Sequence, residues 1–119
     1  MQTAASLATL LIALLQSWIL ILEMFFWTRP LGRKTFRLSE EFATASRVLA
    51  ANQGLYNGFL AAGLFWGLWL GAEGSAVRCF FLGCVLTAGI FGAATVGRKI
   101  LFVQGLPAAV ALLLVALAG

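Results

Sequence analysis

The chain has 119 residues, of which 62% are hydrophobic and only 10% are charged. Soluble domains carry about 25% charged residues, so this composition excludes a water-soluble globule and indicates an integral membrane protein. The net charge of +4 does not point to nucleic acid, because the basic residues lie in loops between apolar runs. We therefore expect the lipid bilayer as the partner of the chain, and no nucleic acid.

Four apolar runs follow one another along the chain, at residues 4–27, 48–70, 77–96 and 100–118. Each is close to the length of about 20 residues that a membrane-spanning helix needs. They predict an all-α polytopic membrane protein, a four-transmembrane-helix bundle that forms one membrane domain over residues 1–119. The first run lacks a preceding basic segment and is too long for a signal peptide, so we expect it to remain in the protein.

The loop at residues 28–47 is the only connection with room for structure of its own. Its first part, "TRPLGRKTF", contains Pro30 and Gly32, which we interpret as helix breakers. Its second part, "LSEEFATASR", is typical of a helix start, with Ser39 as the N-cap and with Glu40 and Glu41 complementing the helix dipole. The second helix can therefore begin near residue 39, before the membrane-spanning part.

The basic residues predict the orientation in the membrane. Five of the eight Lys and Arg residues lie at positions 28–47 and two at positions 97–99. Four spans place these two loops on the same side, which the positive-inside rule identifies as the cytoplasm. We expect both termini to be periplasmic and the protein to lie in the bacterial inner membrane.

Small residues indicate where helices approach one another. Gly63 and Gly67 form a small-xxx-small pattern in the second helix, which permits close packing against another helix. The third helix carries Gly83, Gly89 and Gly92, which we expect to pack inward in the same way. Pro107 falls in the first turns of the fourth helix, where a missing N–H costs little.

Two short motifs recur. The tripeptide "GRK" occurs at residues 32–34 and 97–99, and "QGL" occurs at residues 53–55 and 104–106. The first motif closes an odd-numbered helix and the second opens an even-numbered one. Either the chain contains a duplicated helical hairpin or the repetition is a coincidence.

Polar residues inside the apolar runs predict a layer near the cytoplasmic ends of the helices. Glu23, Gln53 and Gln104 each lie roughly 7–8 Å from the end of a different helix. Gln16 and Asn57 lie one to two turns deeper. We expect the polar residues of "ANQGLYNG" to satisfy one another and Glu23 across the bundle, because polar groups facing lipid are costly. A salt bridge from Glu23 to Arg29 or Arg47 is the alternative.

This layer is the predicted ligand-binding site, and an ionisable residue inside a membrane is a functional candidate. We interpret the layer as the lining of a cytoplasm-facing polar cavity that binds or passes a small polar or amphipathic molecule. A lipid also fits this description of the ligand. The predicted site residues are Glu23, Asn52, Gln53, Tyr56, Asn57, Gln104 and Gln16. The alternative is a non-catalytic membrane subunit or assembly partner in which the layer only holds helices together.

An intramembrane enzyme is the third hypothesis, for which Glu23 and Tyr56 are the only candidate acid/base pair. The chain has no histidine, the commonest general base and metal ligand, so we assign no catalytic residue, metal or cofactor. Cys79 and Cys84 are five residues apart, which places them on poorly matched helix faces for a disulfide. A homo-oligomer is expected because four short helices enclose little space.

The segments "LEMFFW", "GRKTF", "VLAANQGLYNGFLAAGL", "FFLGC", "AGIFGAATV" and "VQGLPA" resemble a family of small integral membrane proteins of bacteria and fungi, domain of unknown function 1304. The resemblance runs from about Leu22 to Ala109 and implies a four-helix membrane protein with no assigned activity. The chain departs from the family at Leu15 and Gln16, where members often carry Glu-His.

Overall fold

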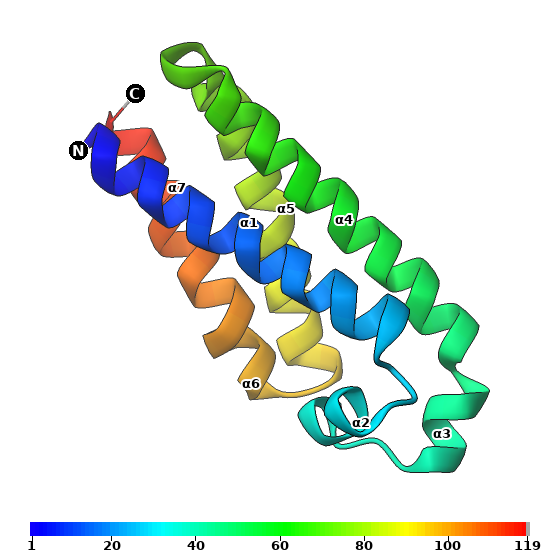
Figure 1. Cartoon of the computed structure of the whole chain (residues 1–119). Helices are drawn as coiled ribbons and strands as arrows, with labels where there is room; N and C mark the ends of the chain where they lie inside the picture. Colours follow the sequence, from blue (N-terminus) through cyan, green and yellow to red (C-terminus); the bar gives the residue numbers. More distant parts are fainter. Residues whose placement is uncertain (119) are drawn as a thin grey trace. The chain divides into compact units, whose positions relative to one another are not determined.

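The computed structural model describes residues 1–118 and is helical almost throughout (Figure 1). The elements in chain order are α1 (Gln2–Phe25), α2 (Pro30–Phe36), α3 (Glu40–Ala45), α4 (Arg47–Trp69), the 3₁₀-helix η1 (Gly71–Gly74), α5 (Ser75–Thr95), α6 (Arg98–Ile100), the π-helix η2 (Leu101–Gly105) and α7 (Leu106–Ala118). The helices predicted at 4–27, 48–70, 77–96 and 100–118 agree with α1, α4, α5 and the α6–α7 segment within two residues at each end.

The number of membrane-spanning helices differs from the prediction. Within residues 1–118, three helices are long and apolar enough to cross a membrane, at Gln2–Phe25, Gly71–Thr95 and Arg98–Ala118. Helix α4 is long enough but too polar, because its first half contains Asn52, Gln53 and Asn57. The all-α prediction is confirmed, whereas the count of four spans is not.

The chain divides into two compact units, and the division falls within α1 and α4. The larger unit comprises residues 1–14 and the chain from Leu60 onward, and the smaller unit comprises Leu15–Phe59. The larger unit contains an apolar core that draws on all of its long helices. Its buried members are Ala5, Ile12, Ala13, Leu64, Leu82, Val85, Ala108, Ala111 and Val115.

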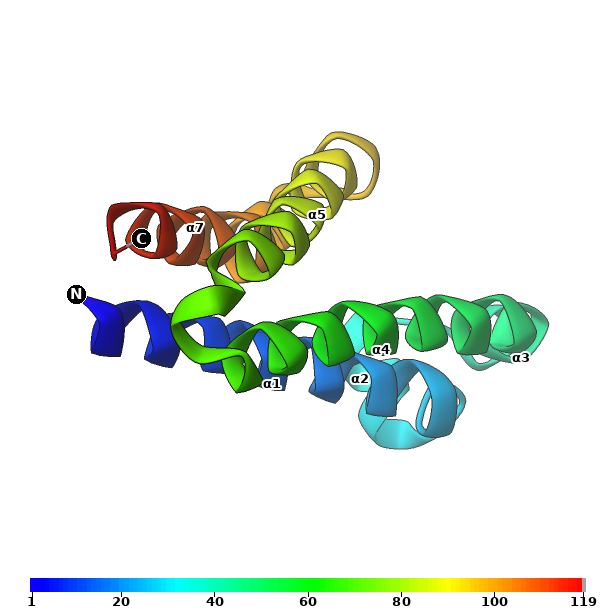
Figure 2. The ribbon, with the colours of Figure 1, turned by 90° about the horizontal axis from the view of Figure 1, so that it is seen from above.

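Helices α5 and α7 lie side by side in the larger unit and run antiparallel (Figures 1 and 2). Directly before α7, at the end of η2, the backbone of Gly105 faces Gly89 of α5 at close range. A Cβ atom added to Gly89 would lie 2.5 Å from the Cα of Gly105 and 2.6 Å from its nitrogen. No side-chain movement could relieve such a contact, so a glycine at position 89 is a condition for this pairing. A Cβ atom at Gly105 would lie 3.6 Å from the Gly89 backbone, which is an ordinary contact distance.

The π-helix η2 ends two residues before Pro107, which is the second residue of α7. The N–H of Leu106 donates to the carbonyl of Leu101, which is five residues back and not four as in an α-helix. This turn of the helix therefore contains one additional residue. Proline lacks an N–H and its ring clashes with the carbonyl four residues earlier in a regular α-helix. The widened turn accommodates Pro107 without ending the helix.

The predicted close packing of Gly63 and Gly67 is confirmed. A Cβ atom at Gly63 would lie 2.4 Å from the ring of Phe81, and one at Gly67 would lie 2.5 Å from the Cγ of Arg78. Arg78 is buried, and its guanidinium donates to the carbonyls of Gly74 and Gly71, each at 3.4 Å. The nearby Cys79 and the more distant Cys84 are half-buried free thiols.

In the smaller unit, the interpretation of Pro30 and Gly32 as helix breakers is wrong. Pro30 is the first residue of α2, a position that tolerates proline because its N–H would be unsatisfied there in any case. Gly32 is buried against the end of α1, where a Cβ atom would lie 1.9 Å from the carbonyl oxygen of Phe26. These residues start and anchor a short helix.

Ser39 caps α3 as predicted, since its hydroxyl accepts a hydrogen bond from the N–H of Phe42 at 3.1 Å. The helix does not run on into α4, because the backbone at Ser46 leaves the helical conformation (φ −98°, ψ 6°). Ser46 also receives a hydrogen bond from the indole N–H of Trp27 at 3.0 Å and donates to the carbonyl of Phe42 at 2.6 Å.

We predict that Gly89→Ala destabilises the folded protein by about 1–3 kcal/mol, because the added methyl group overpacks the contact with the Gly105 backbone. Thermal unfolding in detergent, followed by circular dichroism, measures the loss. Gly83→Ala is the matched control in the same helix, since nothing lies within 4 Å of a Cβ atom there. Equal melting temperatures for the two variants would contradict the close contact.

Candidate functional site

A carboxyl group and an amide meet between α1 and α4 in the smaller unit. Glu23 lies in the last turns of α1 and is only 9% exposed. The amide nitrogen of Asn57, in α4, donates a hydrogen bond to a carboxyl oxygen of Glu23 at 2.5 Å. This hydrogen bond joins the two helices in the smaller unit through a carboxyl group and an amide.

Two glycines of α4 bring α1 close enough for this bond. A Cβ atom at Gly54 would lie 2.7 Å from the side chain of Met24 and 3.2 Å from the carbonyl oxygen of Leu20. One at Gly58 would lie 2.6 Å from the side chain of Leu20. Gly54 and Gly58 form a GxxxG pattern, "GLYNG". The predicted helix contacts did not include Gly54 and Gly58, although the GxxxG pattern is present in the sequence.

Glu23 pairs with Asn57. The prediction favoured Gln53, because the Cα atoms of Glu23 and Gln53 lie at the same depth when residues are counted from the helix ends. Side chains on a helix lean toward its N-terminus. In the antiparallel pair, Glu23 therefore leans toward the middle of α1, while Asn57 leans toward the start of α4. The two side chains converge, whereas the side chain of Gln53 leans away toward the helix end and is exposed.

The remaining polar residues of "ANQGLYNG" do not join this pair. Asn52 is exposed and donates to the carbonyl of Val48 in its own helix at 3.2 Å. Tyr56 is 60% exposed, with its ring 5.9 Å from that of Phe59. Each follows a buried residue of the α1-facing side, Ala50 or Gly54, by two positions, or about 200° around the helix. We expected the polar side chains of this stretch to form hydrogen bonds with one another and with Glu23. The described contacts bear this out for Asn57, which bonds to Glu23.

The exposure of Tyr56 also removes its proposed pairing with Glu23 as an acid/base set. The alternative of a salt bridge is likewise wrong, because within residues 1–118 the carboxyl of Glu23 is engaged by Asn57 and has no basic partner. Arg29 and Arg47 are both exposed.

The two other predicted site residues belong to different parts of the fold. Gln16 is fully buried in the smaller unit. Gln104 is half-buried in η2, in the larger unit. A common level for Glu23 and Gln104 therefore stays a prediction.

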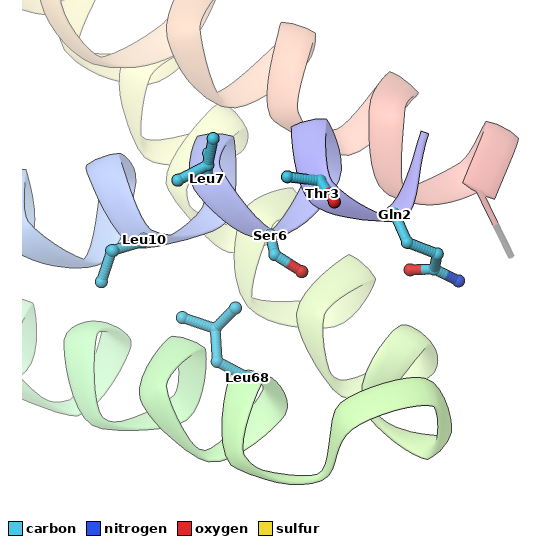
Figure 3. Close-up of a pocket in the computed structure, with 6 residues that line it drawn as sticks. All are labelled: Gln2, Thr3, Ser6, Leu7, Leu10 and Leu68. Carbon is cyan, nitrogen blue, oxygen red and sulfur yellow. The ribbon is translucent and has the colours of Figure 1, made fainter.

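Two hollows on the larger unit are lined by none of the predicted site residues. The first, of about 360 Å³, is lined by Gln2, Thr3, Ser6, Leu7, Leu10 and Leu68, and Figure 3 shows the Leu68 side chain directed toward α1. The second, of about 350 Å³, is lined by Trp66, Ala76, Val77, Phe80 and Phe81. The second lining is apolar throughout, whereas the first combines three leucines with Gln2, Thr3 and Ser6.

Comparison with known proteins gives a family match over most of the chain. A family model described as "Protein of unknown function (DUF1304)" matches residues 10–116. The uncharacterized protein YpaA of Lactococcus lactis subsp. lactis is 32% identical over 100 residues, which cover 82% of this chain and 83% of that protein. No solved structure matches significantly. The resemblance seen in the sequence is confirmed.

We predict that Glu23 and Asn57 are energetically coupled. In a double-mutant cycle with Glu23→Ala and Asn57→Ala, the free energy of unfolding in detergent should reveal a coupling of about 0.6–1.7 kcal/mol, the range for hydrogen bonds between membrane helices. Additive effects of the two substitutions would show that the contact contributes nothing to stability.

Proposed function

The chain belongs to the DUF1304 family of proteins of unknown function, and we propose that it is a four-span membrane protein that binds a small amphipathic molecule at Glu23. The observation that carries the proposal is the buried carboxyl group at the α1–α4 contact, whose partner is an amide and which has no salt bridge within residues 1–118. Ionisable groups so placed are costly in a membrane and mark sites of function.

The chemistry of the pair favours a ligand with a hydrogen-bond donor, such as an amino or hydroxyl group. A carboxylate offers about four lone-pair positions, and Asn57 occupies one of them. The side chains of Met24 and Leu20, which pack against Gly54 and Gly58, supply apolar surface at the same contact. A molecule with a polar head for the carboxyl group and an apolar body for these side chains would therefore match the site. Passage of the same molecule across the membrane would use the same contact.

The assignment of α4 as a fourth span rests on its pairings. Helix α4 runs antiparallel to α1, with Gly54 beside Met24 and Gly58 beside Leu20, and antiparallel to α5, with Gly67 beside Arg78. The side chain of Gln2, at the start of α1, donates to the carbonyl of Ala118, at the end of α7, at 3.2 Å. An even number of crossings is required to return the chain to the end where it started.

A structural role is the second candidate, and the tight packing at Gly54 and Gly58 favours it. In this reading, the hydrogen bond from Asn57 to Glu23 holds α1 to α4, and the protein acts as a non-catalytic subunit or assembly partner. Interhelical hydrogen bonds of this kind are ordinary contacts in membrane bundles.

We predict that both termini are periplasmic in the bacterial inner membrane, because the loops at 28–47 and 97–99 carry seven of the eight basic residues. Alkaline phosphatase fused after the last residue should be active, and green fluorescent protein at the same position should be dark. The reverse pattern would mean that α4 does not cross the membrane or that the orientation is inverted.

We predict that Glu23→Gln weakens binding of a dansyl-labelled alkylamine by about 10- to 100-fold, since a hydrogen bond to a charged group is lost. Fluorescence titration of the purified protein measures binding, and thermal unfolding shows whether the fold is intact. Glu73→Gln is the control, because Glu73 is exposed in η1 and should bind as the unmodified protein does. Binding by Glu23→Gln equal to that of the control would favour the structural role.

A further inference from the structure

Five of the eight basic residues of the chain follow α1, up to and including Arg47, the first residue of α4. Four of them lie on α2 or at its two ends: Arg29, Arg33, Lys34 and Arg37. Arg29 is the N-cap of α2 and Arg37 is its C-cap, while Arg33 and Lys34 lie in its last turn. The four basic residues are therefore gathered on one helix of seven residues and its two caps.

Arg33 differs from the other basic residues of this cluster. Its Nε atom is buried and has no hydrogen-bond partner within the described residues, whereas Arg29, Lys34 and Arg37 are exposed. A buried donor without an acceptor destabilises the fold. An oxyanion in contact with Arg33 would remove this cost, because the guanidinium fork matches phosphate and carboxylate geometry.

The position of Arg33 is fixed by the packing of its neighbours. Gly32 leaves no room for a side chain against the carbonyl of Phe26. The ring of Phe36 lies 5.1 Å from that of Trp27, and Trp27 is itself bonded to Ser46. Helix α2 is therefore held against the end of α1 on one side and linked to the start of α4 on the other, so the cluster is preorganised.

The surroundings of the cluster match a membrane surface. Helix α2 begins five residues after the end of α1, which is one of the helices apolar enough to span a membrane. Leu31 and Phe42 are exposed in the same segment. Basic side chains combined with exposed apolar ones are typical of segments that lie among lipid headgroups.

We propose that Arg33, together with Arg29, Lys34 and Arg37, binds the phosphate group of an anionic phospholipid. Arg33 supplies the buried donor and the geometry, and the three exposed residues supply positive charge. The site is independent of Glu23 and Asn57, so it stands or falls separately from the ligand site proposed above. Free inorganic phosphate has the same oxyanion chemistry and is the other source that the experiment must distinguish.

Native mass spectrometry of the detergent-purified protein measures binding of phosphatidylglycerol, phosphatidylcholine and inorganic phosphate in parallel titrations. We expect phosphatidylglycerol to bind at least about tenfold more tightly than phosphatidylcholine. Arg33→Gln should lower this affinity by about tenfold or more. Lys34→Gln, which removes the same charge from an exposed neighbour, should lower it by only about two- to threefold.

Arg33→Lys separates geometry from charge, because lysine keeps the charge but lacks the planar fork. We expect it to bind phosphatidylglycerol nearly as weakly as Arg33→Gln, with a melting temperature close to that of the unmodified protein. Full binding by Arg33→Lys, together with equal losses in Arg33→Gln and Lys34→Gln, would overturn the site in favour of diffuse charge attraction. Binding of inorganic phosphate as tight as that of phosphatidylglycerol would overturn the assignment to lipid.

Discussion

Close approach between helix backbones is the constraint on which the rest of this structure depends. Lipid tails are as apolar as leucine side chains, so burying apolar surface drives membrane helices together only weakly. In each hairpin, the contact is made by glycines, which have no side chain to keep the two backbones apart. They are Gly54 and Gly58 between α1 and α4, Gly67 between α4 and α5, and Gly89 with Gly105 between α5 and the α6–α7 segment. The short reach of Asn57 to Glu23 is possible only at such a separation.

The two copies of "QGL" acquire a common structural meaning from these contacts. Gly54 packs against α1 and Gly105 packs against α5, so each motif places its glycine at a close contact within a helical hairpin. The two copies of "GRK" do not behave alike. Gly32 is enclosed by the backbone of Phe26, whereas nothing lies within 4 Å of a Cβ atom at Gly97. The two copies of "QGL" therefore have similar structural roles at the hairpin contacts, whereas the two copies of "GRK" in the loops do not.

The helix positions and the N-cap at Ser39 could be predicted from the sequence because apolar run length and capping chemistry are local properties. The partner of Glu23 could not, because depth counted along Cα atoms ignores the direction in which side chains lean on antiparallel helices. The outward position of Asn52 and Tyr56 was also missed. It depends on which glycines form the contact face, and the sequence offers two glycine pairs in the same helix. Helix α2 was missed because Pro30 and Gly32 break helices in the middle but serve well at a start or against a close neighbour.

Arg78 shows how a charge counted in the sequence can be withdrawn from the membrane surface. Its guanidinium donates to the carbonyls of Gly71 and Gly74, and its stem covers Gly67, so the residue fastens the turn between α4 and α5 from within. Because its donors are directed to the carbonyls of its own turn, Arg78 is not available as a contact for lipid headgroups. A basic residue next to an apolar run can therefore act as a clamp on a helical turn, whereas the exposed arginines near α2 remain open to the membrane surface.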